Sequence, residues 1–325
     1  MKKKLRKIVK KNEKLIDIVA LPFVWWSAII LKLYRKSTYI KGFSFPHSKK
    51  ALLDVGVFPI IDHYYEPMFQ PKHLYKPLSE ERKLHGIDWN VDEQLSILKD
   101  FHFQQELNNI PEDYIDDTQF YFKNTVFATG DSEYWYNIIR LKKPKRIIEI
   151  GSGQSTKMAQ LAIQANHKAD TGYQCKHICI EPYEYAWLEK IGVEVKREKV
   201  EDVNLDFFRQ LEANDILFID SSHIIRPQGD VLFEYLELLP TLKSGVIVHI
   251  HDIFSPRNYL DEWVIDKVRF WNEQYLLEAF LSFNSSWKII GSLNYLQHNY
   301  FDFLSEKCPK LTKEREPGSF YIVKT

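Results

Sequence analysis

The sequence predicts an α/β fold: a mostly parallel sheet, flanked by helices, that ends in an antiparallel pair of strands. Three observations predict it. Apolar runs alternate with helical stretches between about residues 146 and 252, as expected of a parallel sheet with helices on both faces. Two further apolar runs, 287–296 and 318–324, are joined by a polar loop that contains proline. A chain of 325 residues that is 45% hydrophobic can also bury a full core.

The parallel part of the sheet comes from five apolar runs separated by helical stretches such as 156–166 and 230–242. The runs are 146–150, 177–181, 193–200, 215–220 and 245–252. Ligands of such sheets bind at the carboxyl ends of the strands, so polar residues at those ends are the candidate site residues.

Helices are also expected on either side of this region. Apolar residues recur at helical spacing in 90–101 and in a helix that begins at Asp131 or Ser132. A long amphipathic helix is predicted over 261–283. The predicted organisation is a basic and apolar N-terminal segment over 1–50, a helical and loop-rich extension over 51–128, and an α/β domain over 129–325.

Composition excludes several classes of protein. The 44 basic and 44 acidic residues balance, so a nucleic-acid partner is not expected. The three cysteines are too few and too unevenly placed for a disulfide framework, which favours reduced thiols in a cytoplasmic protein.

The N-terminal segment suggests contact with a membrane surface. The first 14 residues hold eight Lys or Arg against one Glu, and an apolar stretch with a Trp pair follows. Only 14 uncharged residues lie between Asp17 and Lys32, fewer than the roughly 20 that a spanning helix needs, and Pro22 would bend the stretch. We therefore expect residues 1–36 to lie at the inner membrane face; a true span and a helix packed on the protein itself are the alternatives.

The stretch 146–156, RIIEIGSGQST, places two glycines directly after a strand. A dinucleotide fingerprint would have a third glycine at 156, where this chain has Thr, and a phosphate loop would need a Gly-Lys-Ser/Thr ending. What remains is a carboxylate, Glu149, ahead of Gly151 and Gly153, an arrangement that suits a ligand with an ammonium group. Glu181 ends the next strand, where a carboxylate can accept both hydroxyls of a ribose.

Four motifs together carry a resemblance: IIEIGSGQST, CIEPYEY, DILFIDSSH and LKSGVIVHIHDIF. Their order resembles class I S-adenosylmethionine-dependent methyltransferases, and specifically the bacterial methyltransferase family 24. The resemblance is strong over about 130–255 and implies a Rossmann-like sheet with S-adenosylmethionine as cofactor. Position 155, often glycine in class I enzymes, is Ser here. The predicted cofactor-binding residues are Glu149, Gly151, Ser152, Gly153, Ser155, Glu181, Asp202 and Asp220.

The reaction centre is expected where the fourth and fifth strands end. These strands are neighbours in the class I order, so Asp220 and His223 should meet His251 and Asp252 at one rim. Catalysis of methyl transfer consists mostly of alignment, and a histidine can take the proton of an acceptor hydroxyl. His251 is the first choice for that base and His223 the second, with Asp252 beside them. His249 is expected to be structural.

A divalent metal such as Mg²⁺ is an alternative use of the same rim. Asp220 and Asp252 offer hard oxygens that could hold an ion and acidify a substrate hydroxyl. Imidazole at 251, where a second carboxylate would strengthen the site, shifts the preference away from magnesium.

The favoured function is O-methylation of a hydroxylated small molecule, sugar or glycan intermediate, in the cytoplasm or peripherally at the inner membrane face. Two alternatives stay open: a non-catalytic cofactor-binding or scaffolding protein at the membrane, and a nicotinamide-dependent oxidoreductase, which the missing glycine at 156 disfavours.

Overall fold

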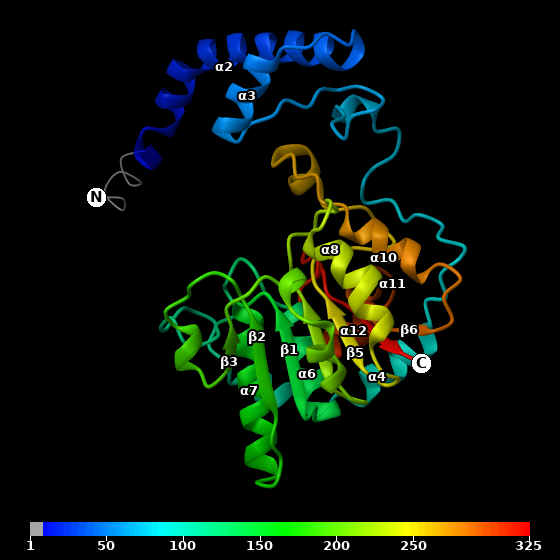
Figure 1. Cartoon of the computed structure of the whole chain (residues 1–325). Coiled ribbons are helices and arrows are strands. Elements are labelled where there is room, and N and C mark those ends of the chain that lie inside the picture. The colour runs from blue at the N-terminus through cyan, green and yellow to red at the C-terminus, as the bar shows by residue number, and fades with distance from the viewer. Residues whose placement is uncertain (1–8) are drawn as a thin grey trace. The chain divides into compact units, whose positions relative to one another are not determined.

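The computed structural model describes residues 9–325, which divide into two compact units at the junction of Tyr75 and Lys76 (Figure 1). The predicted boundaries at 50 and 128 therefore do not coincide with the division in the structure. Residues 76–128 belong with the catalytic unit because their aromatic and aliphatic side chains enter its core, among them Phe101, Leu107, Phe120, Phe122 and Phe127.

The catalytic unit is built on one seven-stranded sheet, which confirms the predicted fold class. The strand order is β3-β2-β1-β4-β5-β7-β6, parallel throughout except for β7, which pairs antiparallel with both β5 and β6. The strands are β1 Arg146–Ile150, β2 Lys176–Ile180, β3 Glu194–Lys196, β4 Ile216–Ile219, β5 Ile247–Ile250, β6 Trp287–Ser292 and β7 Phe320–Lys324.

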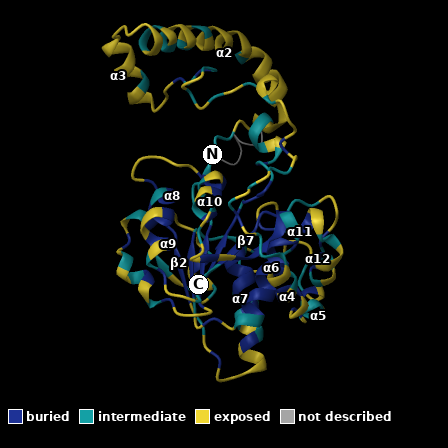
Figure 2. Cartoon of the chain, turned by 90° about the vertical axis from the view of Figure 1, so that its right-hand side faces the viewer, coloured by how far each residue is buried: buried dark blue, intermediate teal, exposed yellow. Residues whose placement is uncertain are grey.

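The central strands are buried on both faces, so they read as nearly unbroken apolar runs. Alternate residues along each strand enter two separate cores. In β4, Leu217 and Ile219 belong to one core, and Ile216 and Phe218 belong to the other. Figure 2 shows the buried interior of this unit under a more exposed outer surface.

Helices cover both faces of the sheet. One core is completed by helices α6 and α7, and the other by the continuous α8–η6–α9 segment and by α10. The helices of this unit are α4 Val91–Lys99, α5 Gln104–Asn108, α6 Asp131–Lys142, α7 Gln154–Ala169, α8 Asp230–Leu232, η6 Phe233–Leu238, α9 Leu239–Thr241, η7 Glu262–Asp266, α10 Glu273–Leu281, α11 Leu293–Asn299 and α12 Phe301–Lys307. Short 3₁₀ segments occur at Pro71–His73, Leu188–Lys190, Val200–Asp202 and Leu205–Gln210.

Three local predictions were wrong. The cap of α6 is Gly130, whose N–H is held at 3.0 Å by the Glu133 carboxylate, rather than Asp131 or Ser132. The apolar run 287–296 is only half strand, since α11 begins at Leu293 and α12 follows within the predicted polar loop.

The helix predicted over 261–283 is also broken. It stops after η7, Val268 takes a positive φ of 51°, and α10 begins at Glu273. The break has a physical reason: the N–H groups of Asn272 and Glu273 donate to the carbonyl oxygen of His223, at 2.9 and 3.2 Å, so the first turn of α10 is fixed to the loop after β4.

The N-terminal unit consists of helices joined by loops, and it includes the 3₁₀ segment at Pro71–His73. Helix α2 Glu13–Arg35 continues into η1 Lys36–Ile40, and α3 Pro46–Val55 follows. Pro22 lies within α2 without ending it, and no residue of α2 is buried. By length and composition, 13–40 is the one helix among the described residues that could cross a membrane. The first eight residues of the predicted membrane segment lie outside the described residues.

Candidate functional site

The turn after β1 needs glycine at its first position. Gly151 has a positive φ of 84°, and a Cβ there would lie 2.3 Å from the backbone oxygen of Asp220 at the end of β4. The turn therefore packs directly on the neighbouring strand. Gly153 differs, since its φ of −174° is ordinary extended backbone and a Cβ there would meet nothing within 4 Å.

Thr156 explains how the turn is held without a third glycine. Its hydroxyl oxygen accepts from the N–H of Gly153 at 3.0 Å and donates to Oε2 of Glu149 at 2.5 Å. Glu149 was predicted to bind the cofactor, but it is fully buried on the face of β1 that α7 covers. Side chains alternate along a strand, so Glu149 lies opposite Ile148 and Ile150 and supports the turn from behind.

A cavity of about 240 Å³ opens in front of this turn, at the carboxyl ends of β1, β2 and β4, and we call it the glycine-turn cavity. Of the predicted cofactor-binding residues, Gly151, Glu181 and Asp220 line it. Ser152, Gly153 and Ser155 belong to the adjoining turn and first helical turn without lining it. The sequence selected Asp202 after the third strand, but its neighbour Glu201 is the residue that lines the cavity, whereas Asp202 is exposed.

Glu181 lies where the sequence predicted a ribose-binding carboxylate. It directly follows β2, its side chain is largely buried, and Oε1 accepts from the N–H of Tyr183 at 2.9 Å. Burial raises the pKa of Glu181 above its usual value. The N–H of Tyr183 and the positive charge of Arg197 partly oppose that rise.

The structure brings together the four residues predicted to meet at the rim, Asp220, His223, His251 and Asp252, which we call the rim cluster. Nε2 of His223 lies 3.3 Å from Oδ1 of Asp220 and 3.6 Å from Oδ2 of Asp252. Nδ1 of His251 lies 3.7 Å from Oδ1 of Asp220 and 3.5 Å from Oδ1 of Asp252. Each histidine thus faces both carboxylates.

Two members of the rim cluster have unusual backbone conformations. His223 has a φ of 61° and Asp252 a φ of 59°, in the left-handed region that side chains other than glycine seldom adopt. Such positions concentrate at functional sites, where the surrounding structure offsets a cost on the order of 1–3 kcal/mol each. Here the positive φ of each residue turns the backbone in the segments that follow β4 and β5.

The charges of the rim cluster depend on one another. Burial alone would lower the pKa of His251, but the carboxylates of Asp252 and Asp220 outweigh it and raise that pKa to about 9. The pKa of His223 is also raised despite burial, by Asp220 and Glu273. Burial would raise the pKa of Asp220, but hydrogen bonds from the two histidines lower it well below the usual range. Burial raises the pKa of Asp252.

Sequence reasoning missed two residues behind His223. Nδ1 of His223 lies 2.7 Å from Oε2 of Glu273, and the hydroxyl of Tyr235 donates to Oε1 of Glu273 at 3.0 Å. The indole of Trp271 packs on the other side, 4.3 Å from the imidazole centroid. Neither Glu273 nor Tyr235 was singled out from the sequence. The unbroken helix expected over 261–283 would have placed Glu273 in its middle rather than at the start of a helix.

His249, which was expected to be structural, is packed among aromatic side chains. It is fully buried, stacks on Tyr321 with centroids 4.1 Å apart, and contacts Phe218 and Trp135. Neither ring nitrogen has a hydrogen-bond partner among the described residues. Burial, and then the charge of His251, lower the pKa of His249 well below its usual value.

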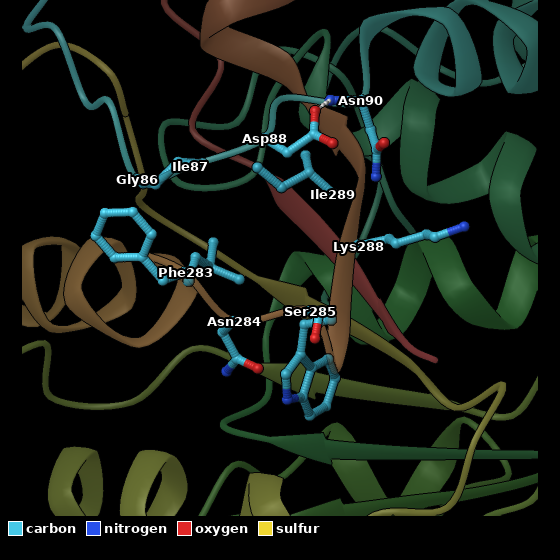
Figure 3. A pocket seen from close by; sticks show the side chains of 11 residues that line it. Gly86, Ile87, Asp88, Asn90, Phe283, Asn284, Ser285, Lys288 and Ile289 are labelled. Carbon is cyan, nitrogen blue, oxygen red and sulfur yellow. Dashed lines mark hydrogen bonds between the residues drawn. The ribbon is translucent and has the colours of Figure 1, made fainter.

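A larger cavity of about 410 Å³ lies beside the edge strand β6 (Figure 3). Its lining comes from 86–90 and 281–289 and includes none of the residues predicted for the site. The N–H of Asn90 donates to Asp88 there at 3.0 Å. No titratable cluster faces this cavity among the residues described, so the chemistry points to the smaller one.

Comparison with known proteins identifies the domain. Residues 148–253 match the model of a family described as a methyltransferase domain. An uncharacterised protein of Archaeoglobus fulgidus is 28% identical over 179 residues, which cover 48% of this chain and 79% of that protein.

Two solved structures are similar at low scores. An O-methyltransferase from Bacillus cereus, in complex with SAH, is 13% identical, with a TM-score of 0.36 over 73% of this chain and 98% of that one. The plantazolicin methyltransferase BpumL, also in complex with SAH, is 15% identical, with a TM-score of 0.34 over 60% of this chain and 81% of that one. Such scores do not bear on the substrate of this chain. Residues 148–253, about a third of the chain, match this methyltransferase-domain family, and the match and the observed sheet confirm the resemblance seen in the motifs.

Proposed function

We propose that this enzyme transfers the methyl group of S-adenosylmethionine to a hydroxyl oxygen of a small molecule, sugar or glycan intermediate in the cytoplasm. One observation supports this most strongly: Asp220 belongs both to the glycine-turn cavity and to the rim cluster. A ligand in the cavity therefore ends beside two histidines that can exchange a proton.

The glycine-turn cavity fits the cofactor in three respects. In the adjoining turn, open space lies beside Gly153, since a Cβ there would meet nothing within 4 Å, so a ligand can approach that backbone. Glu181 presents a carboxylate at the end of β2, in the position suited to two ribose hydroxyls. Ser155, which replaces a frequent glycine, is buried and its carbonyl oxygen accepts from the Trp135 indole at 3.2 Å, so the helix accommodates a side chain there.

When bound, S-adenosylmethionine would supply a methyl carbon on a sulfonium, to which an acceptor oxygen bonds in line as the carbon–sulfur bond breaks and a neutral thioether leaves. The chain's own residues align the acceptor and remove its proton. His251 is the proposed base, and Asp220 and Asp252 orient its ring and stabilise the imidazolium that forms. His223 is the second candidate, held from behind by Glu273.

A divalent ion at the rim is the second candidate mechanism. Atoms of Asp220, His223 and Asp252 lie within 4.8 Å of one another, close enough to share one ion. The set contains two carboxylates and one imidazole, a mixture suited to Mn²⁺ or Zn²⁺ at least as well as to Mg²⁺. Such an ion would lower the pKa of an acceptor hydroxyl and reduce the need for a base.

The decisive experiment measures cofactor binding and then transfer. Calorimetry of the full chain with S-adenosylmethionine and with its demethylated product should show one binding site, weakened by E181Q. Methyl-labelled cofactor is then incubated with lipid, glycan and small-molecule fractions of the source organism, and label should appear in a methyl ether. Absence of binding heat for both nucleosides with folded protein would overturn the proposal.

We also propose that residues 1–36 attach the enzyme to the inner membrane face. At 100° per residue, the five charged residues of α2 fall on one side of the helix: Glu13, Lys14, Asp17, Lys32 and Arg35. That side also carries Ala28 and three apolar residues, Leu21, Val24 and Leu31. The opposite side is bulky and apolar, each residue 60–63% exposed: Leu15, Val19, Trp26, Ile30 and Leu33. This division suits a helix lying in the interface, with the basic residues of 1–14 near anionic headgroups.

A further inference from the structure

A second buried polar cluster lies behind the glycine turn, on the face of β1 and β2 that α7 covers. It consists of Glu149, His177 and Cys179, which we call the β1–β2 cluster, and their exposed fractions are 0%, 4% and 0%. His177 and Cys179 have no role in the proposed methyl transfer. Burying a carboxylate, an imidazole and a thiol together is costly unless they share a partner.

The three ligand atoms lie close enough together to share one metal ion, and Sγ of Cys179 also donates to Oε2 of Glu149. Nε2 of His177 lies 3.4 Å and Sγ of Cys179 lies 3.6 Å from Oε2 of Glu149, and Sγ and Nε2 are 4.0 Å apart. The nitrogen–oxygen separation exceeds that of a normal hydrogen bond. The point equidistant from the three atoms is about 2.1 Å from each, which matches zinc bonds to nitrogen and oxygen and is about 0.2 Å shorter than a zinc–sulfur bond.

Two neighbouring side-chain groups bear on whether the β1–β2 cluster could hold a metal ion. Oε1 of Glu149 is buried and has no hydrogen-bond partner among the described residues, so a fourth donor atom is available beside the cluster. Nδ1 of His177 lies 2.8 Å from the amide nitrogen of Gln160, which fixes the ring with Nε2 toward the cluster, and a metal on Nε2 requires this amide to turn over. With a metal on Nε2, Nδ1 carries the proton and the Gln160 amide presents its oxygen.

We propose that Glu149, His177 and Cys179 bind one zinc-like divalent cation as a closed structural site. Binding releases the thiol proton to solvent and forms a sulfur–metal bond, with no change of oxidation state. The ion joins β1 to β2, and because Glu149 accepts from Thr156, which holds Gly153, it also stiffens the glycine turn.

The test uses the full chain without a metal-binding tag, prepared metal-free and then titrated with Co²⁺ and Zn²⁺. One equivalent of Co²⁺ should produce a thiolate-to-cobalt charge-transfer band, which one equivalent of Zn²⁺ abolishes. C179S should lose the band, whereas C175S, a substitution of the half-buried cysteine four positions earlier, should keep it. Zn²⁺ should raise the unfolding temperature of the wild type and of C175S.

The band distinguishes this site from the rim cluster, which contains no thiol. Wild-type protein that binds Co²⁺ without a charge-transfer band, or that binds none, would overturn the proposal. So would metal binding that C179S retains and D220N loses. Wild-type spectra decide the question even if C179S fails to fold. The proposal does not depend on the methyl acceptor.

Discussion

His223 and Glu273 form a buried ion pair, with Nδ1 and Oε2 2.7 Å apart, although 50 positions separate them in the sequence. The pair leaves Nε2 of His223 facing Asp220 and Asp252. Glu273 therefore orients a rim histidine without touching the cavity. This arrangement parallels the way a carboxylate orients the histidine of a catalytic triad.

E273Q is expected to lower kcat/KM by at least about tenfold, the scale of loss when a group that orients a histidine is removed. The amide cannot balance the imidazolium, so the ring loses its fixed orientation. Y235F, which removes only the hydroxyl that donates to Oε1, is the control and should lose much less than E273Q, because the carboxylate that pairs with His223 is retained. Wild-type kinetics for E273Q would show that Glu273 does not position His223.

The two turn glycines should respond differently to alanine. G151A forces a positive φ and a 2.3 Å contact with the backbone of Asp220, so it should lower the free energy of unfolding by several kcal/mol, on the order of 2–4. G153A meets nothing, so stability should be unchanged while affinity for S-adenosylmethionine falls at least about tenfold. Denaturant unfolding and calorimetry measure the two effects. Unimpaired cofactor binding by G153A would place the ligand elsewhere.

The pH dependence of transfer should separate a histidine base from a metal. His251 has its pKa raised to about 9 by Asp252 and Asp220, so its neutral form increases as pH rises to about 9. In chelator-treated enzyme, kcat/KM should rise about tenfold per pH unit and level off near 9. D252N removes the neighbour that raises this pKa most and should move the bend to lower pH. A flat profile would exclude His251 as base, and a bend that moves only on addition of Mn²⁺ or Mg²⁺ would favour the metal.

His249 should make the protein sensitive to acid. The folded-state pKa is far below the usual value near 6.5, whereas the unfolded chain protonates near 6.5. Above pH 6.5, His249 therefore does not lower the free energy of unfolding. As pH falls below 6.5, protonation of this histidine in the unfolded chain lowers that free energy by up to about 1.4 kcal/mol per pH unit. H249L removes this loss, so its advantage over the wild type should grow from pH 7 to pH 5. H102L, at an exposed histidine, controls for loss of an imidazole, and parallel pH curves for H249L and the wild type would refute the interpretation.

Membrane attachment should depend on one side of α2. W26E places a charge on the apolar side and should abolish co-sedimentation with vesicles that contain anionic lipid. A28E, on the charged side, is the matched control and should retain most of it. High salt or alkaline carbonate should release the wild type if the helix lies in the interface. Retention after carbonate extraction would indicate a spanning helix instead.

Most strands of the sheet, and the four residues of the rim cluster, could be predicted from the sequence. Apolar runs marked β1, β2, β4 and β5, because burial on both faces leaves little choice of side chain, whereas β3 is a short, partly exposed strand. Polar residues at the ends of β4 and β5 marked Asp220, His223, His251 and Asp252. The roles of these residues in catalysis and cofactor binding stay predictions. Their convergence followed from the strand order that the resemblance implied.

The rest could not be predicted because it depends on tertiary contacts. Helical periodicity in 261–283 gave no sign of the break, which exists because the carbonyl of His223 binds the N–H groups of Asn272 and Glu273. Which face Glu149 occupies was implicit in strand alternation, yet its position before two glycines suggested contact with the ligand. Thr156, the residue that counted against a dinucleotide, is the one that holds the turn.

The double tether between His223 and the start of α10 restricts the loop after β4. Both the carbonyl oxygen and the imidazole of His223 are bound to Glu273, so this loop cannot swing outward without unravelling the first turn of that helix. The segment 261–271 leads into that turn, and the indole of Trp271 packs on the imidazole of His223. Trp263 and Trp271 lie edge to face with Arg269 stacked over both, so the aromatic side chains beside the rim histidine are held together as one unit.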